Sequence, residues 1–274
     1  MSSSNSGTMR STKPSAFQSN MLAGKTALIT GAGSGINKGI ALHFASHGAN
    51  VVMVGRRQEK LDETKVEIEA LGGKALGCSA DVRDYDALAA AAVKGAETFG
   101  PYDIVIAGAA GKFIAPASQL SANGFGAVID IDLKGTFNTF RACSEHFAKT
   151  DVSLIAISAP QAVNPMPMQS HACSAKAGIE MLIKSLAVEW GPNGVRVNGL
   201  SPGYVEDTVG GNLFMAGDGG ETLRKRIPLQ RVTNVQEMAE MALMLCSPVS
   251  AYMTGHVIAL DGGVSLVGAG AWQG

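Results

Sequence analysis

Three glycines at alternate positions, Gly31, Gly33 and Gly35, separate an apolar run from an amphipathic one in the segment 25–40. This pattern is typical of a strand, a tight turn and a helix. Glycine allows positive φ and a close approach of the backbone to a ligand, and the free N–H groups at a helix start favour an anion. The turn suits a pyrophosphate, although a glycine-rich turn can also be purely structural. We expect a dinucleotide to contact it at Gly31, Gly33, Ser34, Gly35 and Ile36.

Residues after the next two predicted strands indicate which dinucleotide binds. NAD is normally held by an acidic residue after the second strand, and that acid would repel an additional 2′-phosphate. Here Gly55 takes that position and Arg56 and Arg57 follow, and a guanidinium binds phosphate well. The pair predicts NADPH, with two solvated surface arginines as the alternative. After the third strand, Asp81 and Val82 are placed to contact the adenine, unless Asp81 forms a helix cap or turn.

Seven short apolar runs alternate with longer stretches of helical period from Asn20 onward. The strands are expected at Thr26–Ile29, Val51–Val54, Lys74–Ser79, Ile104–Ile106, Ser153–Ser158, Arg196–Leu200 and Val257–Leu260. Strands that alternate with helices predict a parallel sheet, and right-handed crossovers then place helices on both faces. We therefore expect an α/β fold of the Rossmann type, a single doubly wound parallel sheet that binds ligands at the carboxyl ends of its strands.

The domain organisation is expected to be simple. No internal repeat or long linker interrupts the pattern, so residues 22–274 are expected to form one domain. Residues 1–21 are rich in Ser, Asn and Thr and are expected to be a disordered leader. Several glycines loosen the segment 206–231, which is expected to be a mobile lid over the substrate.

The composition favours small-molecule chemistry. The 274 residues are 46% hydrophobic with a formal net charge of −1, which is enough apolar material for one large core. A near-neutral charge without a basic stripe argues against a nucleic-acid partner. Four cysteines lie scattered without metal-ligand spacing, and no apolar run has membrane length. We expect no metal site and no membrane partner.

Several motifs together resemble those of the short-chain dehydrogenase/reductase family over residues 22–265. They are the turn from Thr30 to Ile36, Lys176, Asn198 with Ser201-Pro-Gly203, and Thr254-Gly255 with Asp261-Gly-Gly263. The resemblance implies the Rossmann fold and a cofactor that also contacts Ala109, Lys176, Pro202, Gly203 and Thr208.

The usual catalytic set of that family is largely replaced. Its tyrosine position, four residues before the lysine, holds Ala172, its serine position holds Ala159, and its helix asparagine is Asp132. The third glycine of its turn is Asn37, and its Asn-Asn-Ala-Gly motif reads Ala107-Gly-Ala-Ala110. Ordinary carbonyl reduction needs an acid at the substrate oxygen, and a methyl group cannot move protons.

One branch of the family has the same set of changes, and the chain resembles the 2,4-dienoyl-CoA reductases, especially the peroxisomal type. The matching segments are Ala109-Ala-Gly-Lys-Phe113, Asp130-Ile-Asp132, Gly135-Thr-Phe-Asn138, His171-Ala-Cys-Ser-Ala-Lys176 and Ala187-Val-Glu-Trp-Gly-Pro192. This resemblance implies NADPH-dependent reduction of a 2,4-dienoyl-CoA thioester to a trans-3-enoyl-CoA, in unsaturated fatty acid breakdown, by a homotetramer.

Hydride addition at the far end of the diene sends charge to the thioester oxygen, so a dienolate must be stabilised and a carbon protonated. Asp132, or a water that it holds, is the expected proton source. Lys176 is expected to hold the nicotinamide ribose and to lend positive potential. Alternatively, Asp132 is a helix residue satisfied by backbone donors and Lys176 is a surface side chain. Substrate contacts are expected at Lys112, Phe113, Ser158 and Arg224, the last toward the phosphates of coenzyme A.

Two other classes of function stay open from the sequence. One is a carbonyl or 3-oxoacyl reductase with its acid elsewhere, and the other is a non-catalytic NADPH-binding protein. The chain ends in Ala-Trp-Gln-Gly and lacks the peroxisomal Ser-Lys-Leu address, so we expect a cytoplasmic location.

Overall fold

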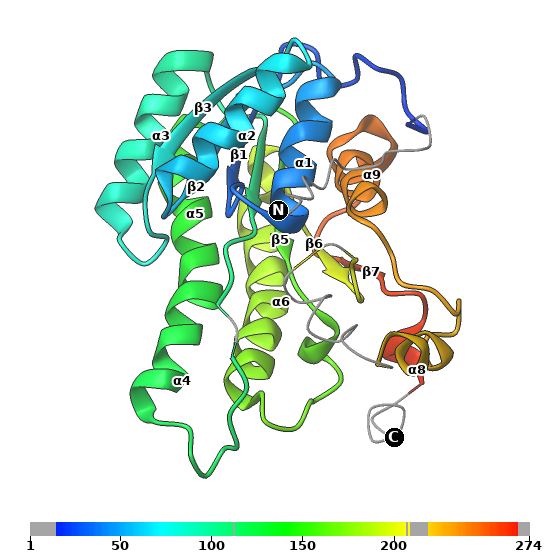
Figure 1. The fold of residues 1–274 in the computed structure, drawn as a ribbon. Coiled ribbons are helices and arrows are strands. Elements are labelled where there is room, and N and C mark those ends of the chain that lie inside the picture. The colour runs from blue at the N-terminus through cyan, green and yellow to red at the C-terminus, as the bar shows by residue number, and fades with distance from the viewer. Residues whose placement is uncertain (1–14, 112, 207, 209–218, 268–274) are drawn as a thin grey trace, which may run out of the picture.

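The computed structural model describes residues 15–111, 113–206, 208 and 219–267, and these form a seven-stranded parallel sheet with helices on both faces (Figure 1). The strands are β1 (Thr26–Thr30), β2 (Asn50–Gly55), β3 (Lys74–Ser79), β4 (Ile104–Ala107), β5 (Val152–Ile157), β6 (Val195–Pro202) and β7 (Val257–Leu260). Their order across the sheet is β3-β2-β1-β4-β5-β6-β7. The expected doubly wound sheet is confirmed, and only the strand ends differ slightly from the expected ones.

The central strands are apolar because the sheet is covered on both faces. Every residue of β1, β4, β5 and β6 is buried. In β1, Ala27 and Ile29 belong to one apolar core and Leu28 belongs to the other. Successive side chains of a strand point to opposite faces, so one apolar run contributes to two cores.

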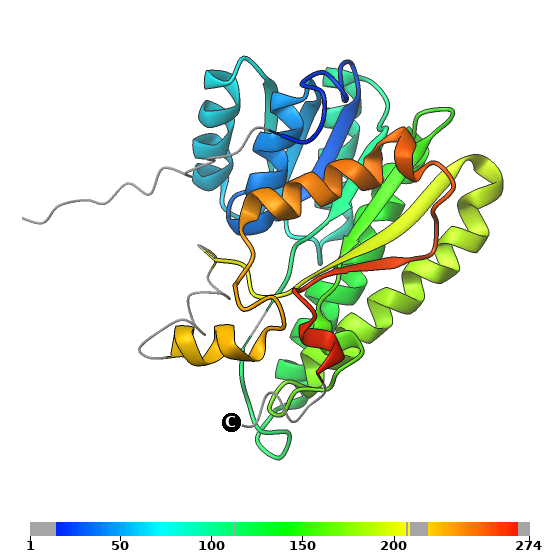
Figure 2. The same cartoon turned by 90° about the vertical axis from the view of Figure 1, so that its right-hand side faces the viewer.

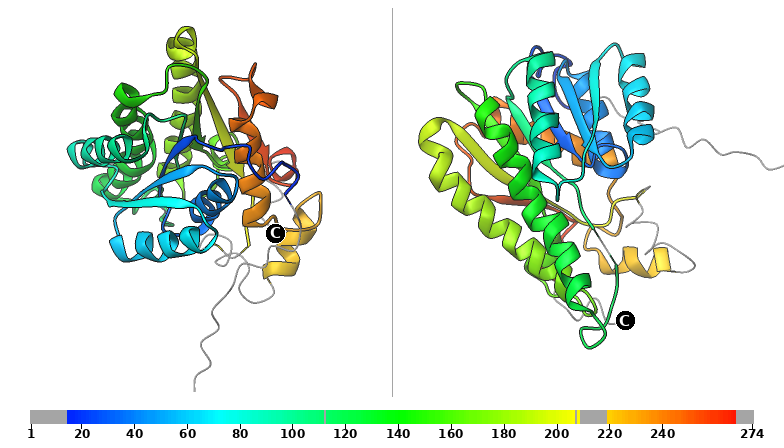
Figure 3. Two further views of the ribbon diagram at one scale, coloured as in Figure 1. Left: turned by 90° about the horizontal axis from the view of Figure 1, so that it is seen from above. Right: turned by 90° about the vertical axis from the view of Figure 1, so that its left-hand side faces the viewer.

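The helices form one layer on each face of the sheet (Figures 1 and 3). The α-helices are α1 (Gly35–Ser46), α2 (Gln58–Ala70), α3 (Tyr85–Phe99), α4 (Ala122–Val128), α5 (Gly135–Cys143), α6 (Ser170–Trp190), α8 (Gly219–Arg226) and α9 (Val235–Cys246). Short 3-10 turns lie at Ser144–His146, Pro160–Ala162, Gly191–Asn193, Pro248–Ser250 and Val264–Leu266. Helices α1, α2 and α9 pack on the face of Ile29, and α3, α5 and α6 pack on the face of Leu28. Figure 2 shows α8 outside these layers.

The segment before β1 contacts the domain where it is described. Residues 15–21 belong to the expected leader, yet Ser15 Oγ donates to Glu240 Oε2 at 3.0 Å and Phe17 packs against the core beside α9. In the expected lid, residues 207 and 209–218 lie outside the described part of the chain.

The sheet has its switch point at β1, which lies between β2 and β4. Ligands of open parallel sheets bind outside the carboxyl ends of the strands at such a point. The glycine turn after β1 and the arginine pair after β2 both lie at this edge. No helix in the described ranges is long and apolar enough to cross a membrane.

Candidate active site

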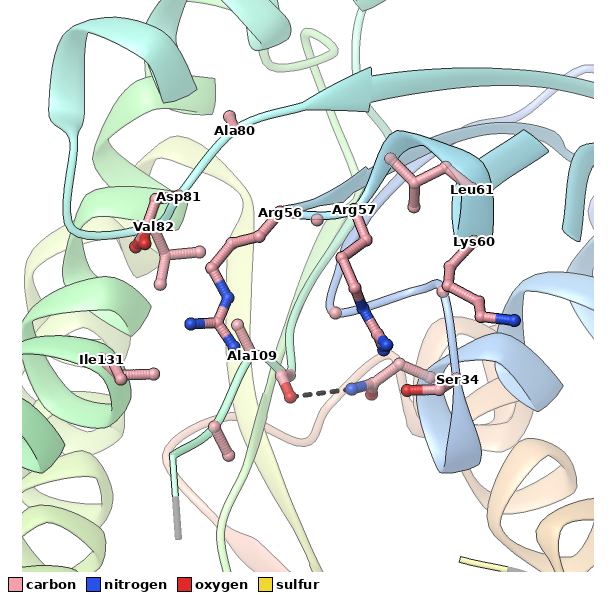
Figure 4. A pocket seen from close by; sticks show the side chains of 16 residues that line it. Ser34, Arg56, Arg57, Lys60, Leu61, Ala80, Asp81, Val82, Ala109 and Ile131 are labelled. Carbon is pink, nitrogen blue, oxygen red and sulfur yellow. Dashed lines mark hydrogen bonds between the residues drawn. The ribbon is translucent and has the colours of Figure 1, made fainter. Parts of the chain in front are cut away.

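A cleft of about 250 Å³ opens at the carboxyl ends of β1, β2, β3 and β4 (Figure 4). The expected cofactor residues from Gly31 to Ala109 line it, with the exception of Gly35 and Ile36. The tertiary structure therefore brings together turns that follow four different strands.

The glycine turn adopts backbone angles that most residues avoid. Gly31 has a φ of +76° and Gly35 a φ of +57°. A Cβ at Gly33 would lie 3.0 Å from the Cβ of Lys60, so a side chain there would crowd α2. Ser34 is the N-cap residue of α1, but its side chain makes no capping hydrogen bond. The first N–H groups of a helix lack intrahelical partners, so this turn can bind an anion.

Arg56 and Arg57 extend from the end of β2 into the cleft, and Arg57 points toward Ser34 (Figure 4). Both side chains are exposed, and neither forms a salt bridge with any residue that the structure describes. Two guanidinium groups that lack a carboxylate partner can bind a phosphate bidentately.

Asp81 also lines the cleft, but its carboxylate is already paired. Arg83 donates to both of its oxygens, from Nη2 at 2.7 Å and from Nε at 3.0 Å. This hydrogen bonding by Arg83 holds the pKa of Asp81 below its ordinary value. The backbone N–H of Arg83 donates to the same carboxylate, so Asp81 forms the turn that was the alternative to an adenine contact.

A second cavity of about 300 Å³ adjoins the cleft and shares Asn37, Gly108 and Ala110 with it. It is lined by the expected residues Ile36, Asp132, Ser158, Lys176, Pro202, Gly203 and Thr208. The shared wall connects the arginine pair to the lysine, as an extended dinucleotide requires. The residues present therefore fit a nicotinamide dinucleotide with a 2′-phosphate.

Asp132 and Lys176 form a buried ion pair in the second cavity. Lys176 Nζ lies 3.2 Å from Asp132 Oδ2, and the two side chains are 10% and 2% exposed. The other oxygen, Asp132 Oδ1, accepts from Gly111 N at 2.7 Å, and Lys176 Nζ donates to Ile157 O at 2.9 Å. An ammonium has three N–H donors, so one remains for a ligand.

The local structure explains how these two side chains meet. Asp132 lies in a π-helical turn, Ile129–Lys134, between α4 and α5, and such turns are rare and frequently occur at functional sites. The turn packs closely on α6 because position 178 is a glycine. A Cβ at Gly178 would lie 2.7 Å from Leu133 Cδ2. Figure 3 shows α5 and α6 side by side.

The family's tyrosine and serine positions both line this cavity as alanines, Ala172 and Ala159. Another tyrosine, Tyr204, lines it from the segment after β6. Burial raises the pKa of Tyr204, and the nearby Arg226 only partly opposes this effect. A phenol with a raised pKa is poorly suited to exchange protons near neutral pH.

Ser158 lines the cavity as expected, but its hydroxyl proton is directed to Glu180. Its Oγ donates to Glu180 Oε1 at 2.8 Å, and its backbone N–H donates to Leu200 O. A hydroxyl has a single proton, so Ser158 can accept a hydrogen bond from a ligand but cannot donate one to a thioester oxygen while this bond is present.

Two expected substrate residues, Phe113 and Arg224, do not line either cavity. Phe113 stacks on the ring of His171 at a centroid distance of 4.4 Å and lines neither cavity, and Arg224 lies on α8. Lys112 lies outside the described residues. In the described part of the chain, no group of three or more His, Cys, Asp or Glu residues is arranged to hold a metal.

The walls also contain residues that the sequence did not single out as site residues, among them Asn37 and Tyr204. Each had a signal in the sequence. Asn37 stands where the family pattern has glycine, and Tyr204 directly follows the Pro202-Gly203 pair.

A doubly wound sheet with a glycine-lined cleft and a buried carboxylate–ammonium pair at its carboxyl edge is the architecture of a dinucleotide-dependent oxidoreductase.

Comparisons with known proteins also indicate an oxidoreductase. A family model described as enoyl-(acyl carrier protein) reductase matches residues 31–265. A peroxisomal 2,4-dienoyl-CoA reductase of Danio rerio is 39% identical over 92% of this chain and 85% of its own length. A peroxisomal 2,4-dienoyl-CoA reductase of Saccharomyces cerevisiae is 36% identical over 90% of this chain and 86% of its own length. Both names specify (3E)-enoyl-CoA as the product.

Solved structures agree as well. A short chain dehydrogenase of Bacillus anthracis has a TM-score of 0.80 and 39% identity over 88% of this chain and 96% of its own. A gluconate 5-dehydrogenase of Burkholderia cenocepacia, in complex with NADP and tartrate, has a TM-score of 0.83 and 27% identity over 90% of this chain and 98% of its own. The chain belongs to the short-chain dehydrogenase/reductase family.

The expected cytoplasmic location is wrong by the same comparison. The zebrafish and yeast relatives are both named as peroxisomal enzymes. The expectation depended on the last residues of the chain. An organelle address is a short tag that a receptor reads, and it is independent of the folded domain.

Proposed function

We propose that this protein reduces 2,4-dienoyl-CoA thioesters to trans-3-enoyl-CoA with NADPH, in unsaturated fatty acid breakdown. The names of the relatives support the reaction and the acyl-CoA substrate. The observation that carries the proposal is the Asp132–Lys176 ion pair in a cavity where the family's tyrosine position is Ala172. The pair supplies a held proton source and positive potential without a phenol.

NADPH, when bound, supplies the hydride. Lys176 has one N–H left after its bonds to Asp132 and Ile157, and we assign it to the nicotinamide ribose. Its positive charge also stabilises negative charge that develops on the substrate. Asp132 uses one oxygen for Gly111 and one for Lys176, and its remaining lone pairs can hold the water that protonates the dienolate carbon. One hydride and one proton are consumed for each diene reduced.

We assign NADPH rather than NADH to the cleft on the basis of Arg56 and Arg57. The 2′-phosphate distinguishes the two cofactors, and both guanidinium groups reach the cleft (Figure 4). The glycine turn and the N-terminus of α1 are assigned to the pyrophosphate.

We also propose that the protein is a homotetramer, as the family resemblance implies. Helices α5 and α6 lie side by side and carry exposed apolar side chains at Phe137, Met181 and Val188, with exposed fractions of 43%, 61% and 80%. Exposed apolar residues on neighbouring helices are typical of interfaces. Light scattering coupled to size-exclusion chromatography measures the mass of the assembly directly.

The test of function mixes the purified protein with NADPH and a 2,4-dienoyl-CoA. Both the dienoyl absorbance and the NADPH absorbance should fall, and the product should be a 3-enoyl thioester. Reduction of an acetoacetyl thioester at a comparable rate, without dienoyl turnover, would instead indicate a carbonyl reductase. Tight NADPH binding without turnover of either substrate would indicate a non-catalytic binding protein.

Carbonyl reduction remains the second candidate because Tyr204 lines the cavity. A Tyr204→Phe variant separates the two. If dienoyl reduction uses the Asp132–Lys176 pair, this variant should keep its turnover within about threefold of the parent. A loss of about a hundredfold in dienoyl turnover, the usual contribution of a general acid, would indicate that Tyr204 donates the proton.

A further inference from the structure

Asn37 and Gly108 form a contact between the two halves of the active site. Asn37 lies in the first turn of α1, and Gly108 follows β4 directly. Asn37 Nδ2 donates to Gly108 O at 2.7 Å, the bond drawn as a dashed line in Figure 4. Both residues line the dinucleotide cleft and also the cavity of the ion pair.

The contact is steric as well as polar. A Cβ at Gly108 would lie 2.2 Å from Asn37 Oδ1 and 2.5 Å from Asn37 Cγ. Asn37 is only 8% exposed, so its side chain has little room to move away. A side chain at position 108 is therefore incompatible with Asn37 in this conformation.

The two positions show a reciprocal exchange against the family pattern described above. That pattern has glycine at position 37 and asparagine at position 108, whereas this chain has asparagine at 37 and glycine at 108. The structure gives the physical reason, because the Asn37 amide occupies the space into which a side chain at position 108 would extend. A side chain at position 108 is therefore compatible only with a residue at position 37 that lacks the asparagine amide.

A short backbone segment, 108–111, connects the Asn37–Gly108 contact to the Asp132–Lys176 ion pair. The N–H groups of Gly108 and Ala109 face Thr30 Oγ1 at 3.1 and 3.5 Å, and the Gly108 carbonyl is held by Asn37. Three residues after Gly108, the N–H of Gly111 donates to Asp132 Oδ1 at 2.7 Å. The position of the segment 108–111 therefore determines where a donor to the Asp132 carboxylate lies.

We propose that Asn37 is a positioning residue for Asp132: paired with Gly108, it fixes the segment 108–111 and thereby orients the carboxylate of the ion pair. This inference rests on the proposed function, in which Asp132 holds the proton source. Asn37 follows Gly35 in the first turn of α1, but its side-chain amide donates to the Gly108 carbonyl. We therefore expect Asn37 to act more on turnover, through the segment 108–111, than on cofactor binding.

The experiment is a double-mutant cycle of Asn37→Ala, Gly108→Ala and the combined variant, with NADPH binding, kcat and Tm measured for each. Asn37→Ala should lower kcat about tenfold, because small misplacements of a catalytic group have large effects on rate, while the Kd for NADPH changes less than about threefold. Gly108→Ala should lower both kcat and Tm because its Cβ meets the amide. The combined variant should recover the Tm and kcat of Asn37→Ala, because the clash is gone.

Each result that contradicts the proposal rejects a particular part of it. Additive losses of Tm in the combined variant would show that the two residues are not coupled, and the pairing would be rejected. An Asn37→Ala variant with the parent kcat, or with kcat and Kd changed in the same proportion, would reject the positioning role. If the parent protein binds NADPH but does not reduce dienoyl-CoA, the proposed function fails, and the positioning of Asp132 for that reaction fails with it, while the Tm cycle still decides whether the two residues are coupled.

Discussion

Lys176 Nζ and Asp132 Oδ2 lie 3.2 Å apart inside the protein, although the two residues belong to different helices. Removing one partner of a buried ion pair leaves the other charge uncompensated, which is strongly destabilising. The ion pair is stable when buried because each residue has a further hydrogen-bond partner, Gly111 N for Asp132 and Ile157 O for Lys176. Side chains that are held in place before substrate arrives need little rearrangement during the reaction.

Replacing Asp132 should separate catalysis from cofactor binding. An Asp132→Ala variant should lose at least about a hundredfold in dienoyl turnover, the usual contribution of a proton-transfer group, while the Kd for NADPH changes little. Steady-state kinetics and fluorescence titration with NADPH measure the two effects. Asp130→Ala is the matched control, because Asp130 lies on the same π-helical turn but is exposed. Equal losses in both variants, or an active Asp132→Ala protein, would remove Asp132 from the mechanism.

The arginine pair should decide between the two nicotinamide cofactors. Each charge-assisted hydrogen bond contributes about 1.5–3 kcal/mol, so Arg56→Ala and Arg57→Ala should each raise the Kd for NADPH about tenfold or more. Binding of NADH should stay nearly constant, since it has no 2′-phosphate. Isothermal titration with both cofactors measures the ratio. Arg141→Ala serves as the control, because Arg141 on α5 pairs with Glu145 in the following 3-10 turn and lines neither cavity. A parallel loss for NADH would assign the pair a structural role.

Ser158 should be dispensable for proton donation. Because its hydroxyl proton is directed to Glu180, Ser158→Ala should retain dienoyl turnover within about threefold, well below the contribution of a catalytic acid. The measurement is kcat and KM for the dienoyl thioester. A loss of two orders of magnitude would mean that Ser158 turns its proton toward the substrate during the reaction. In that case Glu180→Ala, which frees the Ser158 hydroxyl, should raise the rate.

A salt bridge at the start of α9 should make stability depend on pH in the acidic range. Hydrogen bonding from Arg231, at 2.6 and 2.8 Å, lowers the pKa of Glu237 from 4.5 to about 2. A group whose pKa is lower in the folded state contributes stability above its unfolded pKa and loses it as the pH falls toward the folded value. Glu237→Gln should therefore lower Tm at pH 7, and the difference from the parent should shrink between about pH 4.5 and 2.

Thermal unfolding followed by circular dichroism across this pH range measures the Glu237 effect. Asn234 and Glu237 also form a capping box, and the substitution leaves in place its bond from the Glu237 backbone N–H to Asn234 Oδ1. Glu221→Gln on α8 is a suitable control, because its pair with Lys225 is largely exposed and should contribute little at any pH. A Tm difference for Glu237→Gln that is constant with pH would mean that the carboxylate charge is not responsible.

The amino-acid sequence by itself determined the doubly wound sheet, the glycine turn and the arginine pair. These features are local: the period of apolar residues sets strand or helix, and glycine sets the backbone of the turn. Their positions at one edge of the sheet follow from the right-handed crossovers of parallel strands. The strands lie where they were expected, with small differences at their ends, and the turns after β1 and β2 line the same cleft.

Only the tertiary structure decided how the side chains of the site are paired. The Asp132–Lys176 ion pair depends on how closely the π-helical turn packs on α6 at Gly178, and the direction of the Ser158 proton depends on Glu180. The exclusion of a side chain at position 108 by Asn37 likewise becomes visible only when α1 and β4 are placed together. Such contacts join segments far apart in the chain, and their distances follow from packing, which no local pattern of residue types contains.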